Sequence, residues 1–366
     1  MGRLLRQSWQ PVAVSSALSQ GRAMPIRIMG EDLTLFRGVS GQPYIVAGRC
    51  AHRLSLLHTG WVEDECIRCF YHGWKYDGTG QCVEMPAEDE GFADKVKITS
   101  YSAKEYAGLI FVFMGDGEPP VFPRKAELDR DFGIKYVYTF VWPCNWLQRL
   151  ENSFDATHVS FVHRRTALGS KISTEIPRLN YEETEWGIRQ IAERSPENIR
   201  ISEIAWPNCN HIVTADGPHP DKNPWTDVFN TFVPVDDDHT AQFSARCAPL
   251  RGEAAREYEE WFASNPRYNP AEQGGKLFRE APYFDFHDTV RLVAAQDYVA
   301  QVGQGAIVDR SQERLGKSDT GIIFLRKVFR REMDAIQKGL TGKEWKPRTG
   351  LARLPLPPGV VRVDEE

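Results

Sequence analysis

Two short pairs of cysteine and histidine constrain this chain more than any other feature of its sequence. The first pair is Cys50 and His52, with one residue between them, and the second is Cys69 and His72, with two. Thiolate sulfur and imidazole nitrogen both bind metals. The segment that carries the pairs is rich in glycine and has no helical period. We therefore expect two loops that meet at one metal centre.

Each pair supplies one sulfur and one nitrogen, which is what a Rieske [2Fe–2S] centre requires. In such a centre two thiolates hold one iron and two imidazoles hold the other. Cys50 and Cys69 would thus bind one iron, and His52 and His72 the second. The neutral imidazoles raise the reduction potential by several hundred millivolts over that of an all-thiolate cluster. Such a centre can accept electrons from a ferredoxin or a reductase and pass them on.

A zinc site is the alternative interpretation of the same segment. Cys66 and Cys69 form a C-x-x-C pair that could bind zinc together with the upstream pair. Zinc sites usually take their ligands from C-x₂₋₄-C or H-x₃₋₅-H pairs, however, and the single residue between Cys50 and His52 fits that spacing poorly. We therefore expect Cys66 to be a small buried residue beside the second loop.

A second set of metal ligands follows in residues 147–163, whose pattern is typical of a helix. Asp155 and His158 are three residues apart and would share a helical face, while His163 requires the helix to distort or end after His158. Two histidines and a carboxylate suit mononuclear Fe(II), because they leave coordination positions open for O₂. This spacing also arises by chance, and the upstream pairs are what give it weight.

Length and charge restrict the domain organisation and the partners. The chain has 366 residues, and domains usually span roughly 100–200. Its net charge of −5 does not favour nucleic acid as a partner. No apolar run reaches the roughly 20 residues that cross a bilayer, and the N-terminus lacks the apolar core of a signal peptide. We expect a cytoplasmic protein of two domains that binds neither nucleic acid nor membrane.

The pattern of secondary structure changes at residues 115–120, a stretch rich in glycine and proline. Before it, alternating apolar and polar residues predict strands at 24–29, 33–37, 43–47 and 108–113, with a turn at 30–32. After it, strands are expected at 228–235 and 242–247, amphipathic helices at 253–262 and 322–340, and an extended tail at 354–358. We therefore predict an all-β domain over residues 1–120 and a mixed domain over 121–366.

Longer stretches around these motifs resemble a known family. Residues 50–53, 69–77 and 80–86 are similar to the cluster-binding loops of Rieske oxygenases, and residues 4–12 resemble the start of phthalate-dioxygenase-type oxygenase subunits. Most relatives have proline in place of Ala51 and a glycine or proline after Arg53, whereas this chain continues with Leu54. The resemblance covers nearly the whole chain and implies the oxygenase component of a Rieske non-haem iron oxygenase, in the group of phthalate dioxygenases and aryl-ether O-demethylases.

The resemblance implies an α+β protein with an N-terminal all-β Rieske domain. The C-terminal domain would be a helix-grip catalytic domain with an antiparallel sheet. The resemblance also provides a third iron ligand that spacing could not select, since residues 294–316 are similar to the segment with the iron-binding aspartate and Asp297 takes its position. Asn152 matches a position beside the iron, where a hydrogen bond is expected. We expect Asp309, Arg310 and Glu313 to form salt bridges and helix caps.

In the family, the aspartate that matches Asp155 is not a metal ligand. It joins a cluster histidine of one subunit to an iron histidine of the next, because one carboxylate can accept the outward N–H of two imidazoles. Here it would join His72 of one chain to His158 of its neighbour. Head-to-tail contacts that close produce a ring, so the resemblance implies a homotrimer.

The implied activity is oxidation of a small aromatic substrate with O₂. No dinucleotide fingerprint and no four-cysteine ferredoxin motif is present, so the electrons are expected from a separate NAD(P)H-dependent reductase or a ferredoxin. The same iron chemistry serves ring dihydroxylation of an aromatic acid and O-demethylation of a methoxylated aromatic, and both stay open. Arg246 and Arg291 are candidates to bind a substrate carboxylate, although salt bridges at the surface are the commoner role of arginine.

Two other classes of protein also stay open. A Rieske electron carrier would need only the first domain and would not need His158, His163 and Asp297. A zinc-stabilised binding module would be colourless, whereas a Rieske protein is red-brown.

Overall fold

The computed structural model describes residues 2–164, 175–214, 217–218, 226–265, 269–279, 292–352 and 354. Arg291 and the predicted tail beyond residue 354 lie outside this part of the chain. The chain divides into two compact units: unit 1 is Met1–Phe122 with Val233–Asp236, and unit 2 is Pro123–Phe232 with Asp237–Glu366. Of the residues described, no helix is long and apolar enough to cross a membrane.

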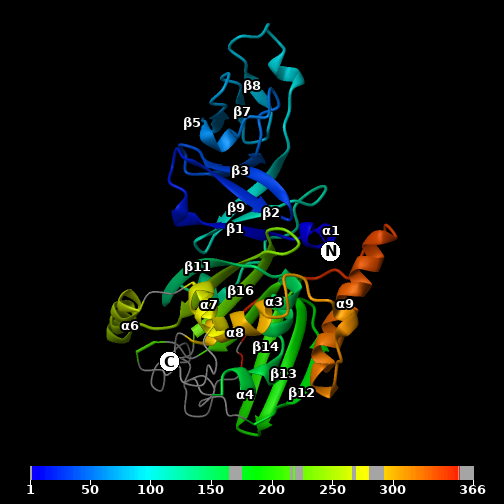
Figure 1. Ribbon diagram of the computed structural model, residues 1–366. Coiled ribbons are helices and arrows are strands. Elements are labelled where there is room, and N and C mark those ends of the chain that lie inside the picture. The colour runs from blue at the N-terminus through cyan, green and yellow to red at the C-terminus, as the bar shows by residue number, and fades with distance from the viewer. Residues whose placement is uncertain are drawn as a thin grey trace. The chain divides into compact units, whose positions relative to one another are not determined.

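Unit 1 consists of two antiparallel sheets (Figure 1). The larger has the strand order β1 (Gln10–Val14), β10 (Leu109–Phe113), β9 (Ser100–Tyr106), β4 (Pro43–Ala47), β3 (Glu31–Arg37) and β2 (Ala23–Ile28). The smaller has the order β5 (Trp61–Glu63), β6 (Cys66–Arg68), β7 (Lys75–Asp77) and β8 (Cys82–Glu84). Its helical turns are short: α1 (Gly2–Arg6), η1 (Ser15–Ala17), η2 (Leu57–Thr59) and η3 (Ala93–Lys95).

The hairpin of β2 and β3 shows how local sequence sets the register. Ile26 and Ile28 alternate with exposed residues and are buried, as expected of a strand with one face in a core. Met29 and Gly30 both have positive φ, 50° and 79°, as in a two-residue turn that matches the twist of the strands. The turn predicted at 30–32 is therefore wrong by about one residue, whereas the four strands predicted in this part are confirmed.

Three of the four clustered cysteines belong to the core beneath the small sheet. Cys50, Cys69 and Cys82 are almost fully buried there with Ile67. Cys66 is only half-buried and lies outside this core, so the burial expected for it is wrong. The reason is strand alternation: Ile67 occupies the inward face of β6, and its neighbour must point the other way.

Unit 2 is built on a seven-stranded antiparallel sheet, which confirms the α+β class with an antiparallel sheet. Its order is β11 (Ile134–Trp142), β17 (Thr240–Ala248), β16 (Thr226–Pro234), β15 (Cys209–Thr214), β14 (Asn198–Ala205), β13 (Gly187–Ser195) and β12 (Arg178–Glu183). The helical elements are α2 (Ala126–Asp129), α3 (Trp146–Ser153), α4 (Ala156–Val162), α6 (Gly252–Ser264), α7 (Pro270–Arg279), α8 (Leu292–Val302), η5 (Arg310–Gln312), η6 (Lys317–Asp319) and α9 (Thr320–Gln337).

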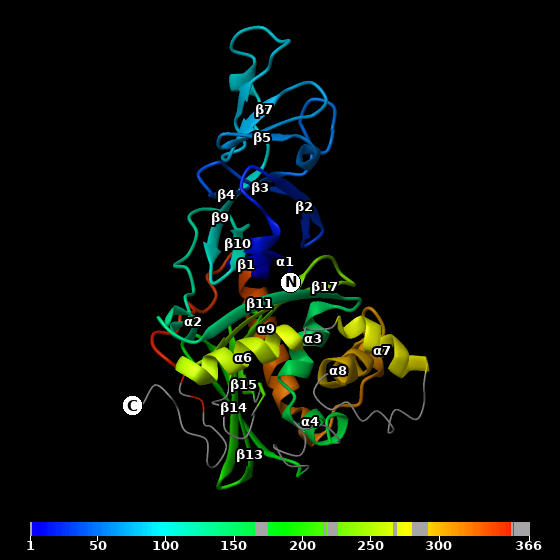
Figure 2. The ribbon, with the colours of Figure 1, turned by 90° about the vertical axis from the view of Figure 1, so that its left-hand side faces the viewer.

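Helices α3, α4, α7 and α8 lie on the same side of this sheet (Figures 1 and 2). The face of the sheet that meets them is identified by Gln242 on β17, which accepts a hydrogen bond from Arg149 of α3 at 2.6 Å. Alternation along β17 places Ser244 and Arg246 on that face too. The two strands and two amphipathic helices predicted in this part of the chain are confirmed, with small changes of their bounds.

The helix-like pattern of residues 147–163 corresponds to two helices, because the chain breaks between α3 and α4. Asp155 has extended backbone and caps α4: its carboxylate accepts from the backbone N–H of Thr157 at 2.8 Å and of His158 at 3.3 Å. Such a cap competes with continuing the helix. Asp155 therefore does not share a helical face with His158. Helix α4 does end at Val162, between the two histidines.

A buried network of charges ties the C-terminal segment to the other face of the sheet. The Arg348 guanidinium lies 2.6 Å from Glu127 Oε1 and 2.9 Å from Glu203 Oε2, and it donates to His211 Nδ1 at 3.2 Å. Because His211 accepts at Nδ1, its proton is on Nε2, which lies 3.1 Å from Asp227 Oδ1. Glu127, Glu203, His211 and Asp227 are all buried.

We predict that Arg348→Ala strongly destabilises unit 2. Removing one partner of a buried ion pair leaves Glu127 and Glu203 without compensation and costs about 3–5 kcal/mol. The unfolding temperature, measured by scanning calorimetry at one scan rate, should fall by roughly 10 °C. The matched control is Lys346→Ala, whose ammonium lies 3.9 Å from Glu185 with both side chains exposed; its cost should stay below about 1 kcal/mol. Equal effects of the two variants would contradict the prediction.

Candidate metal centres

The two loops with the cysteine–histidine pairs have the same backbone arrangement around their cysteines. Cys50 N–H donates to Ser55 O at 2.9 Å, and Cys50 O accepts from Leu54 N–H at 3.0 Å. Cys69 N–H likewise donates to the carbonyl five residues on at 2.8 Å, and Cys69 O accepts from Gly73 N–H at 3.1 Å. Leu54 and Gly73 hold matching positions and both have positive φ. Two equivalent turns therefore present two buried thiols, neither of which is in a disulfide.

The two imidazoles of these loops lie next to each other. The ring centroids of His52 and His72 are 4.4 Å apart, and the His52 ring stacks on Trp74 at 4.6 Å. His52 Nδ1 is buried without a hydrogen-bond partner in the described part of the chain. The pKa of His72 is lowered, first by lost hydration and then by His52 and Arg53, which favours the neutral imidazole that binds a metal. The two thiols and two imidazoles fit a cluster that needs two of each.

The arrangement argues against one zinc ion. A single ion gathers its ligand atoms closely, whereas two irons keep the thiolates apart from the imidazoles. Among the described residues, no group of three histidine, cysteine or carboxylate ligand atoms within 4.8 Å of one another contains Cys50, Cys66 or Cys69. Cys66 in particular lies outside the core that holds the other three clustered cysteines.

Tyr76 contacts one of these thiols and was not identified from the sequence. Its hydroxyl oxygen lies 3.2 Å from Cys50 Sγ and accepts the Ala51 backbone N–H at 3.2 Å. Because that oxygen already accepts one bond, its own proton is available to the sulfur. Burial, and then the Cys50 thiol, raise the pKa of Tyr76, so the hydroxyl keeps its proton. Only the position of Tyr76 within the loop motif could have pointed to it.

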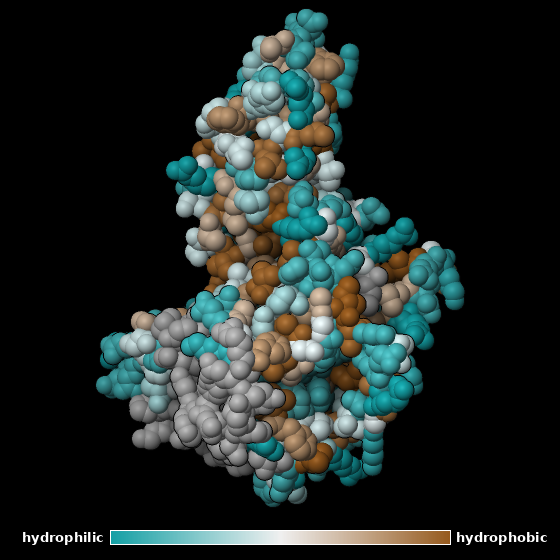
Figure 3. Space-filling view, in the orientation of Figure 1, coloured by the Kyte–Doolittle hydropathy of each residue, from teal (hydrophilic) through white to brown (hydrophobic). Residues whose placement is uncertain are grey.

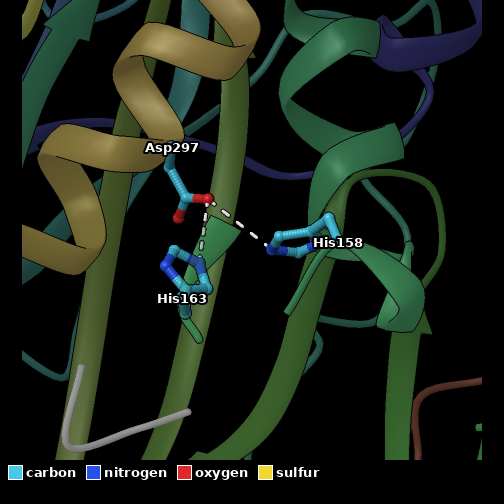
Figure 4. A group of neighbouring side chains, drawn as sticks. All are labelled: His158, His163 and Asp297. Carbon is cyan, nitrogen blue, oxygen red and sulfur yellow. Dashed lines mark ion pairs between the residues drawn. The ribbon is translucent and has the colours of Figure 1, made fainter. Parts of the chain in front are cut away.

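The second centre lies in unit 2, where His158, His163 and Asp297 point toward one another (Figure 4). Asp297 Oδ1 lies 3.6 Å from His158 Nε2 and 3.3 Å from His163 Nε2. All three ligand atoms lie within 4.8 Å of one another. His158 comes from α4, His163 directly follows that helix, and Asp297 comes from α8. Residues far apart in sequence thus converge as three donors of the kind that a facial triad requires.

The outward nitrogens of both histidines are held by acceptors, which fixes their tautomers. His158 Nδ1 contacts the backbone carbonyl of Asp155, and His163 Nδ1 lies 2.9 Å from Gln296 Oε1. A carbonyl oxygen can only accept, so Nδ1 carries the proton in each ring. Both Nε2 atoms then face Asp297 with a lone pair, as metal ligation requires. The donor set therefore fits a mononuclear iron.

Charge and hydrogen bonding both orient the carboxylate of this centre. Asn152 Nδ2 donates to Asp297 Oδ1 at 3.2 Å. Burial acts to raise the pKa of Asp297, but the two imidazoles and the Arg149 guanidinium hold that pKa below its ordinary value. Burial likewise acts to lower the pKa of His163, and the Asp297 charge outweighs it and raises that pKa. Asp297 is therefore an anion at neutral pH, ready for a cation.

Helix α3, which carries Asn152, is anchored by the salt-bridge set predicted near residue 310. Arg310 lies 2.9 Å from Glu151, and Arg326 bridges Glu151 at 2.6 Å and Glu313 at 2.6 Å. Asp309 caps a short 3₁₀ turn by accepting the Ser311 N–H. The structural role predicted for Asp309, Arg310 and Glu313 is thereby confirmed.

Another group of ligand atoms, from Glu127, His211 and Asp227, also lies within 4.8 Å. Arginines already pair with the carboxylates of this group. Arg348 contacts Glu127 and His211, and Arg130 lies 3.2 Å from Asp227. The group therefore serves the structural network described above. The remaining predicted residue, Arg246, has its guanidinium 5.5 Å above the Tyr138 ring.

Comparison with known proteins identifies both halves of the chain. Residues 8–102 match the family model of the Rieske [2Fe-2S] domain, and residues 142–204 match that of the vanillate O-demethylase oxygenase C-terminal domain. The 5,5'-dehydrodivanillate O-demethylase oxygenase subunit of Sphingobium sp. is 31% identical over 93% of this chain and 78% of its own length. The phthalate 4,5-dioxygenase oxygenase subunit of Pseudomonas putida is 30% identical over 93% of this chain and 84% of its own.

The fold has solved counterparts as well. The oxygenase in the reduced complex between oxygenase and ferredoxin in carbazole 1,9a-dioxygenase superposes with a TM-score of 0.66, at 20% identity over 89% of each chain. A model match to the Rieske domain, relatives aligned over most of both chains, and a common fold agree with one another. The chain therefore belongs to the Rieske non-haem iron oxygenases, as an oxygenase component with a [2Fe–2S] cluster and a mononuclear iron.

Proposed function

We propose that this chain is the terminal oxygenase of a multicomponent system that oxidises a small aromatic substrate with O₂. Residues 1–120 would form the cluster domain, with Cys50, His52, Cys69 and His72 as the cluster ligands. Residues 121–366 would form the catalytic domain, with His158, His163 and Asp297 as the iron ligands. The observation that carries the proposal is the convergence of two imidazole lone pairs and one carboxylate within 4.8 Å, in a chain that also has a Rieske domain.

Iron bound at this centre supplies the activation of O₂. The chain's own residues prepare the site for it. Asp155 O and Gln296 turn the lone pairs of the two histidines inward, and Asn152 fixes the carboxylate oxygen of Asp297 by a hydrogen bond. This orientation requires no rearrangement when the metal binds, which is how outer hydrogen bonds support a metal site.

Among aromatic substrates we place O-demethylation of a methoxylated aromatic first, because the match of residues 142–204 and the Sphingobium relative both carry that activity in their names. Ring dihydroxylation of an aromatic acid is second, in line with the Pseudomonas relative. The sheet offers a row of rings on the face toward the helices: Tyr136, Tyr138, Phe140 and Trp142 alternate along β11. Arg246 beside Tyr138 would suit a substrate carboxylate.

We propose that the chain forms a homotrimer, and the surface around His72 supports this proposal. Unit 1 shows hydrophobic side chains among hydrophilic ones at its surface (Figure 3). Leu54, Trp61, Phe70 and Tyr71, which belong to or adjoin the cluster loops, are 51–63% exposed. Large exposed apolar side chains grouped around one site mark a contact surface. The proposed occupant is unit 2 of a second copy, where Asp155 would reach His72 and join it to His158.

Electrons are proposed to come from a separate ferredoxin or NAD(P)H-dependent reductase. Both relatives are named as oxygenase subunits, and the carbazole 1,9a-dioxygenase counterpart was solved with a ferredoxin. A cytoplasmic location belongs to the same proposal, and the seven free cysteines support a reducing compartment. An electron carrier is the weaker alternative, because it would not need the three donors in unit 2.

A product assay tests the reaction type. The iron-loaded, reduced protein would be given O₂ with a panel of methoxylated aromatics and aromatic acids, while formaldehyde and cis-diols are both measured. We expect formaldehyde from a methoxylated aromatic. A cis-diol without formaldehyde would instead assign ring dihydroxylation. Reoxidation of the cluster without either product would contradict an aromatic substrate of these kinds.

The bridge between subunits is tested by Asp155→Asn. Asparagine caps a helix as well as aspartate does, so α4 should stay intact. It cannot offer a charged acceptor to the His72 N–H of a second copy, so we expect the cluster spectrum and the iron content to persist while turnover falls at least about tenfold. The rate of cluster oxidation in a single turnover should fall in parallel. Unchanged turnover would exclude the bridging role.

Tyr76→Phe tests the ligand role of Cys50. A hydrogen bond to a cluster sulfur stabilises the reduced, more negative state, so its loss should lower the midpoint potential of the cluster. We expect the ratio of reduced to oxidised cluster at a fixed potential to fall several-fold in a spectroscopic redox titration. Tyr71→Phe is the control, since it removes a hydroxyl from an exposed tyrosine on the second cluster loop. A shift of the same size in the control would rule out the sulfur contact as the cause.

A further inference from the structure

Arg149 on α3 is a buried cation whose nitrogens meet no carboxylate among the residues that the structure describes. Arg149 is 5% exposed. Its Nη1 donates to Gln301 Oε1, and its Nη2 donates to Gln242 Oε1 at 2.6 Å. In the described part of the chain, Nε is buried with no acceptor. The guanidinium carbon lies 3.6 Å from the centroid of the Trp142 ring, so the group is held in one place.

This cation lies one helical turn from the iron site. Arg149 and Asn152 are three residues apart on α3 and so face the same side. Asn152 donates to Asp297, while Arg149 donates to Gln301, four residues further along α8. Both hydrogen bonds therefore lie in the contact between α3 and α8. Burial lowers the pKa of Arg149 to about 10, and the Asp297 carboxylate is the charge that most opposes this shift.

Among the described residues Arg149 has no carboxylate partner, whereas Arg348 and Arg326 are each paired directly with glutamates. A buried cation is unfavourable unless an anion compensates it. Two glutamine oxygens accept hydrogen bonds from Nη1 and Nη2 of Arg149 but bring no compensating charge. The compensating anion is then Asp297, which is also the only proposed iron ligand that carries a charge.

We propose that Arg149 is a positioning residue that sets the charge of the iron site by sharing the Asp297 carboxylate with the metal. This inference rests on the proposed iron ligation. A fixed positive charge a helical turn away opposes the binding of a second cation, with an energy that falls only slowly with distance in a buried site. Arg149 thus weakens the site's affinity for a divalent ion and favours the lower of two oxidation states.

A purely structural role for Arg149 makes the opposite prediction. If the side chain only held Gln242, Gln301 and α3 in place, its replacement would loosen the site and weaken metal binding. The charge role predicts tighter binding when the charge is removed. The sign of the change in affinity therefore separates the two roles, because disorder cannot improve a metal site.

The test uses Co(II) as the probe and the full chain with its cluster loaded and its mononuclear iron removed. Binding is measured by equilibrium dialysis with metal analysis. We expect Arg149→Met to bind Co(II) at least about tenfold more tightly than the wild type. Arg149→Lys, which keeps the charge, should stay within about threefold. Affinity that is unchanged or weaker in Arg149→Met would overturn the proposal.

A second variant tests the charge role of Arg149 even if Arg149→Met fails to fold. Gln301→Glu keeps the size of the side chain and the contact with Arg149 but gives the cation a carboxylate partner of its own. The charge role predicts tighter Co(II) binding here too, and equal or weaker binding would overturn it. His163→Ala in the otherwise native chain serves as the reference. If it does not reduce Co(II) binding, the proposed iron ligation is at fault rather than the role of Arg149.

Discussion

The proposed iron site depends on the hydrogen bonds that the backbone of α4 donates to the Asp155 carboxylate. That cap stops α3 and starts a new helix, so His158 falls in the first turn of α4 and His163 directly after its end. The Asp155 carbonyl then contacts Nδ1 of His158 and turns its other nitrogen inward. One residue therefore sets the local direction of the chain and the tautomer of a ligand. A continuous helix would present the two histidines along different directions.

The two cluster loops share one backbone arrangement. Each cysteine begins the same closed turn, and the two turns bring one thiol apiece into the core of the small sheet. The histidines extend beyond those turns, where Trp74 supports one ring by stacking. The two thiols are buried and the two imidazoles are less buried. The sulfur side of the proposed centre therefore faces the core, and its nitrogen side faces outward. The proposed histidine-bound iron would therefore lie toward the surface of unit 1.

Much of the site could be predicted from the sequence, but for different reasons at different residues. The spacing of Cys50 and His52 indicates a metal centre by itself, so that prediction did not depend on resemblance to a family. Asp297 is one acid among fifty acidic residues, and only family resemblance selected it. The helix break at Asp155 was missed because a capping aspartate looks like a surface residue inside a helical pattern. Arg149 and Gln296 were missed because their partners are distant in sequence, and no local pattern records such contacts.

The first cluster loop contains a leucine in a backbone conformation that favours glycine. Leu54 has φ of 60°, where a side chain costs about 1–2 kcal/mol, while Gly73 meets the same demand in the second loop without strain. The Leu54 side chain is 63% exposed, so burial in the isolated subunit gives little in return. The loop would therefore gain stability from glycine as a monomer. Burial of Leu54 against a second copy, as in the proposed trimer, would offset part of that strain, so the proposed assembly would make this loop more stable than it is in the separate chain.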